Sequence, residues 1–325
     1  MLFLYNTLVR ELTERGVFKK FVPSHPVLSV GNISFGGTGK TPHVICMANY
    51  LIDRGKRVCV LTRGYKRKGA GYRFFRQGEV PESVEAVGDE PFLLKKRVPG
   101  ITMCVGESRH ESMDRVLREE EVDLFLLDDG FQQFRLAKSF DAVLLRYREL
   151  AALDIRAKHF MMRESPLSLR HADFIVITKV PAPFECQNLD FPGSRYLGEV
   201  ERAYTRYRVS CVSTNAGNGA QDWKGVDYFL FGGVADFSGL LDTAREHGIV
   251  VGGFLPLPDH VDYSERTMER IRHLSRGRTL LTSEKDIVKL PYERFGEIHS
   301  ISVDVEFLRG KEQFLGRVLA AAEGV

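Results

Sequence analysis

Residues 31–42, GNISFGGTGKTP, have the glycine content and the Gly-Lys-Thr ending of a phosphate-binding loop, with Ser where the strict pattern has its first Gly. The apolar run before them predicts a buried strand, and the helical spacing after them ends at Gly55. Backbone N–H groups in such a loop bind phosphate oxygens. The lysine reaches the outer phosphates and the threonine hydroxyl ligates Mg²⁺. We therefore predict a nucleoside triphosphate site made of Ser34, Phe35, Gly36, Gly37, Thr38, Gly39, Lys40 and Thr41.

Two adjacent aspartates end a second apolar run. Residues 122–133 read VDLFLLDDGFQQ, so Asp128 and Asp129 stand at the carboxyl end of a predicted strand. Downstream of a phosphate-binding loop, this is where a carboxylate ligates Mg²⁺. The alternative is a strand-end turn that uses Asp-Asp-Gly chemistry. We favour Asp128 and Asp129 as metal ligands.

A second acidic pair lies in AVGDEP, residues 86–91. Asp89 or Glu90 could accept a proton from an attacking hydroxyl near the transferred phosphate. Either could equally cap the helix that Pro91 would start. The spacing alone leaves both roles open.

Other charged segments have two interpretations each. The segment TRGYKRK either binds anionic substrate groups or a membrane surface, or is a solvated basic loop. The residues that would make such contacts are Arg63, Tyr65, Lys66, Arg67 and Lys68. Arg163 stabilises charge on the transferred phosphoryl group, or it pairs with its neighbour Glu164 on the surface.

The elements around these motifs alternate between strands and helices. Further strands are predicted at 56–64, 139–146 and 172–180, which indicates an α/β fold of the P-loop NTPase type with a mostly parallel sheet and flanking helices. A Pro-rich segment at 181–196 precedes a smaller α/β unit. The predicted organisation is an N-terminal helix (1–24), a P-loop core (25–204), the smaller domain (205–304) and a C-terminal segment (305–325) that returns to the core.

The first quarter of the chain is basic. Residues 1–80 hold 14 Lys and Arg against 4 Asp and Glu, a charge of +10, whereas the whole chain carries +3. Such a surface attracts phosphates, acidic lipids or nucleic acid. Residues 1–22 form an amphipathic helical pattern, too short and too charged to span a bilayer. This helix either packs its apolar side on the core or lies in a membrane interface.

Composition excludes several classes of protein. With 43% hydrophobic and 27% charged residues, the 325-residue chain is globular. Its five cysteines contain no C-x-x-C pair, which argues against a zinc site or a secreted disulfide scaffold and favours a reducing compartment.

Seven segments together resemble one family, the tetraacyldisaccharide 4'-kinases of lipid A biosynthesis. They follow in the family's order as VGNISFGGTGKTP, TRGYKRK, GDEP, LDDGFQQ, RESPLSLRHAD, LPDHVDYS and TSEKDIVKL. The match departs from the family at Gln133, where a histidine is common, and at AKHFMMRESP, which lacks a Leu-Pro-Ala-Gly turn.

The resemblance implies transfer of phosphate from Mg-ATP to the 4'-hydroxyl of a tetraacylated glucosamine disaccharide 1-phosphate. It implies that Asp89 is the general base and that His260 pairs with it. It further assigns catalytic roles to Lys40 and Arg163, metal ligation to Thr41, Asp128 and Asp129, and substrate contacts to Arg63, Tyr65, Arg109 and Glu164.

The resemblance also implies a place and partners. The N-terminal helix would dock a peripheral protein on the cytoplasmic face of the bacterial inner membrane. We expect a monomer that binds no nucleic acid, since the basic stretch contains no recognised module. Two rival functions are a membrane-recruited P-loop ATPase switch that binds a protein partner and a soluble small-molecule P-loop kinase or ligase.

Overall fold

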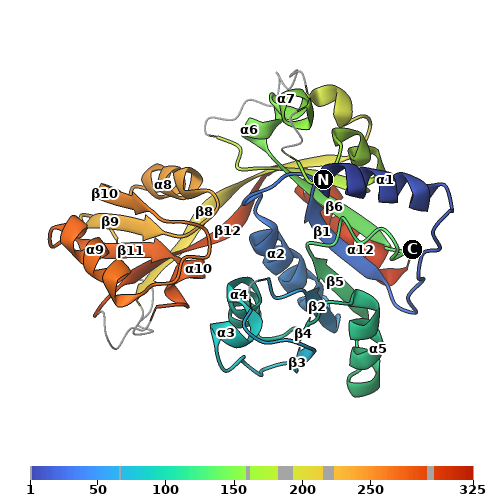
Figure 1. Ribbon diagram of the computed structural model, residues 1–325, viewed down its shortest axis with the longest axis horizontal. Helices are drawn as coiled ribbons and strands as arrows, with labels where there is room; N and C mark the ends of the chain where they lie inside the picture. Colours follow the sequence, from blue (N-terminus) through green and yellow to red (C-terminus); the bar gives the residue numbers. More distant parts are fainter. Residues whose placement is uncertain are drawn as a thin grey trace.

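A continuous sheet runs through both lobes of the molecule (Figure 1). The computed structural model describes residues 2–65, 67–158, 162–181, 193–214, 223–290 and 296–324. The strand order is β10-β9-β11-β12-β8-β7-β6-β1-β5-β2-β4-β3. The strands are β1 (Val27–Asn32), β2 (Val58–Thr62), β3 (Arg73–Phe75), β4 (Thr102–Val105), β5 (Leu124–Asp128), β6 (Phe140–Arg146), β7 (Phe174–Thr178), β8 (Arg202–Thr214), β9 (Asp227–Gly232), β10 (Val250–Pro256), β11 (Thr279–Ser283) and β12 (His299–Arg309).

Helices flank this sheet on both sides. They are α1 (Leu2–Glu14), α2 (Lys40–Ile52), α3 (Val84–Val87), α4 (Asp89–Arg97), α5 (Arg109–Glu119), α6 (Tyr147–Leu150), α7 (Leu153–Lys158), α8 (Phe237–Glu246), α9 (Glu265–Ser275), α10 (Glu284–Ile287) and α12 (Lys311–Glu323), with 3-10 turns η1 (Pro166–His171) and η2 (Ser194–Tyr196).

The larger lobe is built around β1. This strand pairs in parallel with β5 on one side and β6 on the other, so that Leu28 lies beside Leu126 and Phe140. Every residue of β1, β5 and β6 is buried, as expected for parallel strands covered on both faces. The predicted α/β fold of the P-loop type is confirmed.

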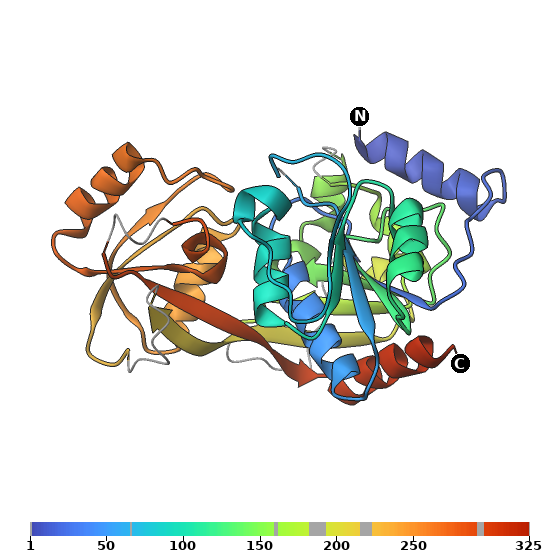
Figure 2. The ribbon, with the colours of Figure 1, turned by 90° about the horizontal axis from the view of Figure 1, so that it is seen from below.

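A long antiparallel ribbon joins the two lobes. Strands β8 and β12 pair from Tyr204 and Arg309 in the larger lobe to Thr214 and His299 in the smaller one (Figure 2). The smaller lobe adds β9, β10 and β11, with α8, α9 and α10 around them. The expected domain limits at 205 and 304 therefore fall inside two continuous strands. Most of the Pro-rich segment 181–196 lies outside the described residues.

Helix α12 packs on the larger lobe. The ring of Phe314 lies 6.1 Å from that of Phe140 and 5.2 Å from that of Phe174, between centroids. Leu315 and Val318 belong to the same buried cluster as Leu28 of β1. The C-terminal helix thus covers the face of the sheet that α2 also covers.

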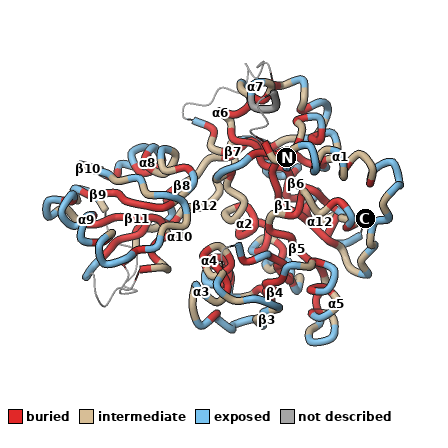
Figure 3. The backbone as a smooth tube through the Cα atoms, in the orientation of Figure 1, coloured by how far each residue is buried: buried red, intermediate tan, exposed pale blue. Residues whose placement is uncertain are grey.

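Helix α1 buries its polar side and exposes most of its apolar side (Figure 3). Asn6 and Arg10 are 5% and 4% exposed, whereas Leu4 and Leu8 are 58% and 59% exposed. The expectation of an apolar face packed on the core is therefore wrong for these leucines, although Phe3 touches the core. The inner side is polar because buried hydrogen-bond partners face it from the larger lobe. Within the described segments, no helix is both long and apolar enough to cross a bilayer.

Candidate active site

A cleft of about 1040 Å³ is bordered by both lobes and by the start of α1. The phosphate-binding loop, Asp128 and Asp129 reach it together because they lie at the carboxyl ends of the neighbouring parallel strands β1 and β5, in which Val30 pairs with Asp128. The carboxyl edge of such a sheet is the usual ligand site. The predicted loop residues on the cleft wall are Phe35, Gly36, Gly37, Thr38, Gly39, Lys40 and Thr41.

Ser34 shapes the loop from behind instead of facing the cleft. It is fully buried, and its hydroxyl donates to Glu149 Oε2 at 3.0 Å. Gly39 has φ of +95°, and a Cβ there would lie 2.1 Å from Tyr207 Oη. A larger residue at position 39 would therefore be strained and would clash. His43 Nδ1 donates to Gly39 O, 2.8 Å away, and so ties the loop to α2.

The two aspartates after β5 have different surroundings. Arg163 Nη1 donates to both carboxylate oxygens of Asp129, at 2.8 and 2.7 Å, and Lys40 Nζ lies 3.5 Å from Oδ1. Burial opposes ionisation of Asp129, but Lys40 and Arg163 outweigh it and lower its pKa. Burial and the nearby Glu90 carboxylate raise the pKa of Asp128 to about 7. Within the described chain, Asp128 Oδ1 is buried without a hydrogen-bond partner.

Asp89 and His260 meet across the two lobes. His260 Nδ1 lies 2.9 Å from Asp89 Oδ2. Lys285 and Lys289 of the smaller lobe place their ammonium groups 3.7 and 3.8 Å from the same oxygen. Burial would raise the pKa of Asp89, but the His260 hydrogen bond and the Lys285 charge lower it to about 2. His260 lines the cleft, whereas Asp89 lies behind it and is 5% exposed.

Neither Asp89 nor Glu90 is the N-cap of the following helix, so the capping alternative is wrong. Helix α4 begins at Asp89, two residues before Pro91, and its N-cap is Gly88 with φ of +96°. Asp89 Oδ1 also accepts from the backbone N–H of Glu90 at 3.1 Å. Its other oxygen faces the smaller lobe, which local sequence spacing could not show.

Glu164 does not lie at the substrate site where the resemblance placed it. It is completely buried under α1, where it pairs with Arg10, and it is not on the cleft wall. Arg163 binds Asp129 instead of its neighbour, so the alternative of an Arg163–Glu164 surface pair is also wrong. The chain bends here, and the two adjacent side chains face different partners.

The remaining predicted contacts surround the cleft. Arg63 and the exposed Tyr65 line it, and the Tyr65 ring lies 5.5 Å from that of His260. Arg109 donates to Gly106 O at 2.9 Å and to Asp128 O at 3.3 Å. Burial lowers the pKa of Arg109 to about 10, although the negative charge of Asp128 acts to raise it. Arg67 and Lys68 are absent from the wall that the described residues form, and Lys66 lies outside the described residues.

Sequence reasoning assigned no role to several cleft residues. Lys179, directly after β7, donates to Gly37 O at 2.7 Å and to Asp236 Oδ2 of the smaller lobe at 2.6 Å. Lys285 contacts Asp89, Glu90 and Asp259. The strand-end position could have indicated Lys179, and the TSEKDIVKL motif contained Lys285. Asp236 had no comparable signal.

Backbone strain is concentrated at this cleft. Asp129, Lys179 and His260 have φ values of 61°, 55° and 61°, in the left-handed region that disfavours side chains. Each such residue costs roughly 1–3 kcal/mol and persists where the surroundings hold it in place. All three carry charged or titratable groups, and all three line the cleft. The strain thus supports a functional role for the cleft.

Comparison with known proteins agrees with this geometry. The model of the family described as tetraacyldisaccharide-1-P 4'-kinase matches residues 1–323. The chain belongs to this family. A tetraacyldisaccharide 4'-kinase of Aquifex aeolicus is 32% identical over 89% of this chain and 87% of its own, and one of Pelobacter propionicus is 33% identical over 82% and 74%.

A solved structure of the tetraacyldisaccharide 4'-kinase family shares the fold. It is the "apo" form of LpxK from Aquifex aeolicus in complex with ATP, and it matches with a TM-score of 0.76 at 28% identity, covering 97% of this chain and 94% of that one. The chain is accordingly a kinase of the lipid A pathway, and the enzyme class that the seven motifs implied is confirmed.

Proposed function

We propose that the chain transfers the γ-phosphate of ATP to the 4'-hydroxyl of a tetraacylated glucosamine disaccharide 1-phosphate. One observation carries the proposal: His260 lines the same cleft as Lys40 of the phosphate-binding loop, and it pairs with Asp89 directly behind the cleft wall. A carboxylate–imidazole pair beside a phosphate-binding loop supports transfer of a phosphate to a hydroxyl. The ATP bound to the solved relative supports ATP as the donor.

The chemistry of each cleft residue indicates which part of the reaction it serves. Backbone N–H groups from Gly36 to Gly39 and the Lys40 ammonium bind the outer phosphates. Arg163, held by Asp129 on the cleft wall, supplies the positive charge that neutralises the transferred group. Arg63, Tyr65 and Arg109 line the part of the cleft that receives the acceptor sugar.

The residues present fit Mg²⁺. Asp128 offers a buried carboxylate oxygen without a hydrogen-bond partner among the described residues, and Thr41 offers a hydroxyl on the same cleft wall. When bound, Mg²⁺ neutralises charge on the phosphates. Asp129, already engaged by Lys40 and Arg163, serves best to hold those two cations in place.

Proton removal involves both partners of the interlobe pair. Asp89 acts as the base for the 4'-hydroxyl, and His260, which lines the cleft, orients the carboxylate and helps carry the proton from the hydroxyl to it. Since His260 comes from the smaller lobe, the pair forms only when the lobes are close. Closure of this kind excludes water from the transferring phosphate.

The test of the function is phosphate transfer in detergent. Purified protein, Mg-ATP labelled in the γ-phosphate and a tetraacylated disaccharide 1-phosphate should give a labelled bisphosphate. An acceptor lacking the 4'-hydroxyl should give none. A folded protein that binds ATP without any transfer would contradict the proposal and favour the ATPase switch.

We also propose that α1 docks the protein, as a monomer, on the cytoplasmic face of the inner membrane. The exposed Leu4 and Leu8 lie on the outer side of α1, while Leu2 and Tyr5 continue onto the cleft wall. An acyl chain held in the membrane could therefore reach the cleft beside the helix.

Replacing Leu4 and Leu8 by Ser should weaken binding to vesicles of anionic phospholipid by about tenfold or more, since each leucine loses its apolar burial in the lipid. Turnover of detergent-solubilised acceptor should change by less than about twofold. Leu274→Ser, on the exposed part of α9, is the matched control. Unchanged vesicle binding in the α1 variant would refute docking through this helix.

A further inference from the structure

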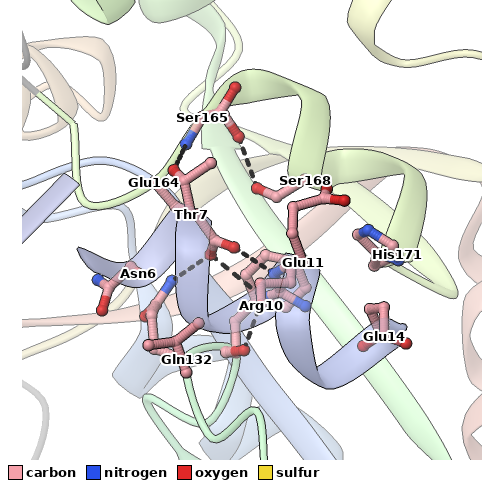
Figure 4. A network of polar contacts seen from close by, with 12 residues as sticks. Asn6, Thr7, Arg10, Glu11, Glu14, Gln132, Glu164, Ser165, Ser168 and His171 are labelled. Atoms are coloured by element: carbon pink, nitrogen blue, oxygen red, sulfur yellow. Dashed lines mark hydrogen bonds and ion pairs between the residues drawn. The ribbon is translucent and has the colours of Figure 1, made fainter. Parts of the chain in front are cut away.

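The inner side of α1 is joined to two active-site loops by one buried arginine (Figure 4). Arg10 Nε and Nη2 both donate to the Glu164 carboxylate, and Nη2 also donates to Phe131 O at 2.9 Å. Its guanidinium lies 4.0 Å from the Phe131 ring centroid and 4.7 Å from that of Phe134. One side chain thus contacts the segment after Asp129 and the segment after Arg163.

Further hydrogen bonds extend these contacts to the catalytic groups. Asn6 Nδ2 of α1 donates to Arg163 O at 2.9 Å, and Ser165 N donates to Thr7 Oγ1 at 3.2 Å. Gln132 Nε2 donates to Glu164 Oε2 at 3.3 Å and to Asn32 O, at the end of β1, at 2.9 Å (Figure 4). Helix α1 therefore fixes the backbone of Arg163, the residue whose side chain binds Asp129.

Stability alone is a weak reason for this arrangement. Arg10 is 4% exposed and Glu164 is not exposed at all. A buried ion pair is often no more stabilising than apolar residues of the same volume. The guanidinium does, however, fix the distance between two loops through hydrogen bonds of defined direction. A displacement of about 1 Å in a catalytic group can cost about 100-fold in rate.

We infer that Arg10 is a positioning residue for phosphate transfer, a role that rests on the proposed function. Its guanidinium, with Glu164 as partner, holds the loop of Asp128 and Asp129 against the loop of Arg163. The outer side of α1 faces away from these loops, so one helix links the exposed apolar surface to the placement of the phosphoryl-binding groups.

The decisive variant is Arg10→Met/Glu164→Met, which replaces the ion pair by apolar side chains and leaves no buried charge unpaired. It is compared with Arg10→Met and with wild type. Arg57→Met is the control, because Arg57 also bridges two carboxylates, Glu121 and Asp123, at the other end of β5. Turnover is measured with detergent-solubilised acceptor, so that membrane affinity has no influence.

We expect kcat to fall by about 10- to 100-fold in both Arg10 variants, with the KM for ATP within about twofold of wild type. Hydrogen exchange should be at least about tenfold faster for amides in 128–135 and 162–168 than in wild type, while amides of β1 and β6 keep their rates. Arg57→Met should behave as wild type in both measurements.

Three results would overturn the inference. The double methionine variant could keep wild-type kcat and exchange rates. Exchange could rise uniformly across the sheet. The KM for ATP could rise while kcat stays at the wild-type value. The exchange measurement needs no acceptor. If wild type transferred no phosphate, the proposed function would fail, while exchange would still decide whether Arg10 holds the two loops.

Discussion

Replacing Asp89 by Asn is expected to lower kcat for phosphate transfer by about 10²- to 10⁴-fold, the usual contribution of a general base. Asn keeps the size of the side chain but cannot accept the proton. Because the pKa of Asp89 is about 2, the wild-type carboxylate is ionised at any working pH. Affinity for ATP should change little, since the phosphate-binding loop lines the cleft and Asp89 lies behind the wall. Initial rates and equilibrium binding of ATP provide the measurement.

Two comparisons sharpen this result. Asp53→Asn removes an exposed carboxylate just after α2 and should leave the rate unchanged. His260→Gln should reduce kcat less than Asp89→Asn does, because a glutamine can still donate a hydrogen bond to the carboxylate. A larger loss at His260 than at Asp89 would instead make His260, which faces the cleft, the group that takes the proton. Normal turnover with lost ATP affinity in Asp89→Asn would contradict its role as the base.

Replacing Lys40 by Met should lower kcat by about 10²- to 10³-fold, comparable with removing one preorganised electrostatic contact from a transition state. It should also weaken ATP binding, since the ammonium contacts the outer phosphates in the ground state as well. In the structure Lys40 Nζ lies 3.5 Å from Asp129 Oδ1, so the variant also leaves Asp129 with Arg163 as its main cation. Single-turnover rates at saturating ATP separate the two effects.

Lys56→Met is the matched control for this variant. Lys56 pairs with Glu323 at the surface, 3.3 Å away, and takes no part in the cleft. It should retain wild-type kcat and ATP affinity. Wild-type kcat in Lys40→Met at saturating ATP would show that the lysine serves only to bind the nucleotide.

The order of motifs along the chain was enough to predict the P-loop fold and most of the cleft. The phosphate-binding loop and Asp128 follow apolar runs, and the carboxyl ends of neighbouring parallel strands necessarily meet at one edge. The local sequence pattern was thus enough to predict that Lys40, Thr41 and Asp128 lie on one cleft wall. Resemblance to the family supplied the pairing of Asp89 with His260, because 171 residues separate them and no periodicity relates two such distant positions.

The tertiary structure decided which side of each element faces inward. The leucines of α1 suggested a buried stripe, yet the helix buries Arg10 because Glu164 and the Phe131 carbonyl lie beneath it. Arg163 and Glu164 are neighbours in sequence but bind different partners, Asp129 after β5 and Arg10 of α1. Amphipathic spacing determines that a helix has two sides. Only the groups opposite can determine which side is buried, since a buried charge requires a partner that local sequence does not contain.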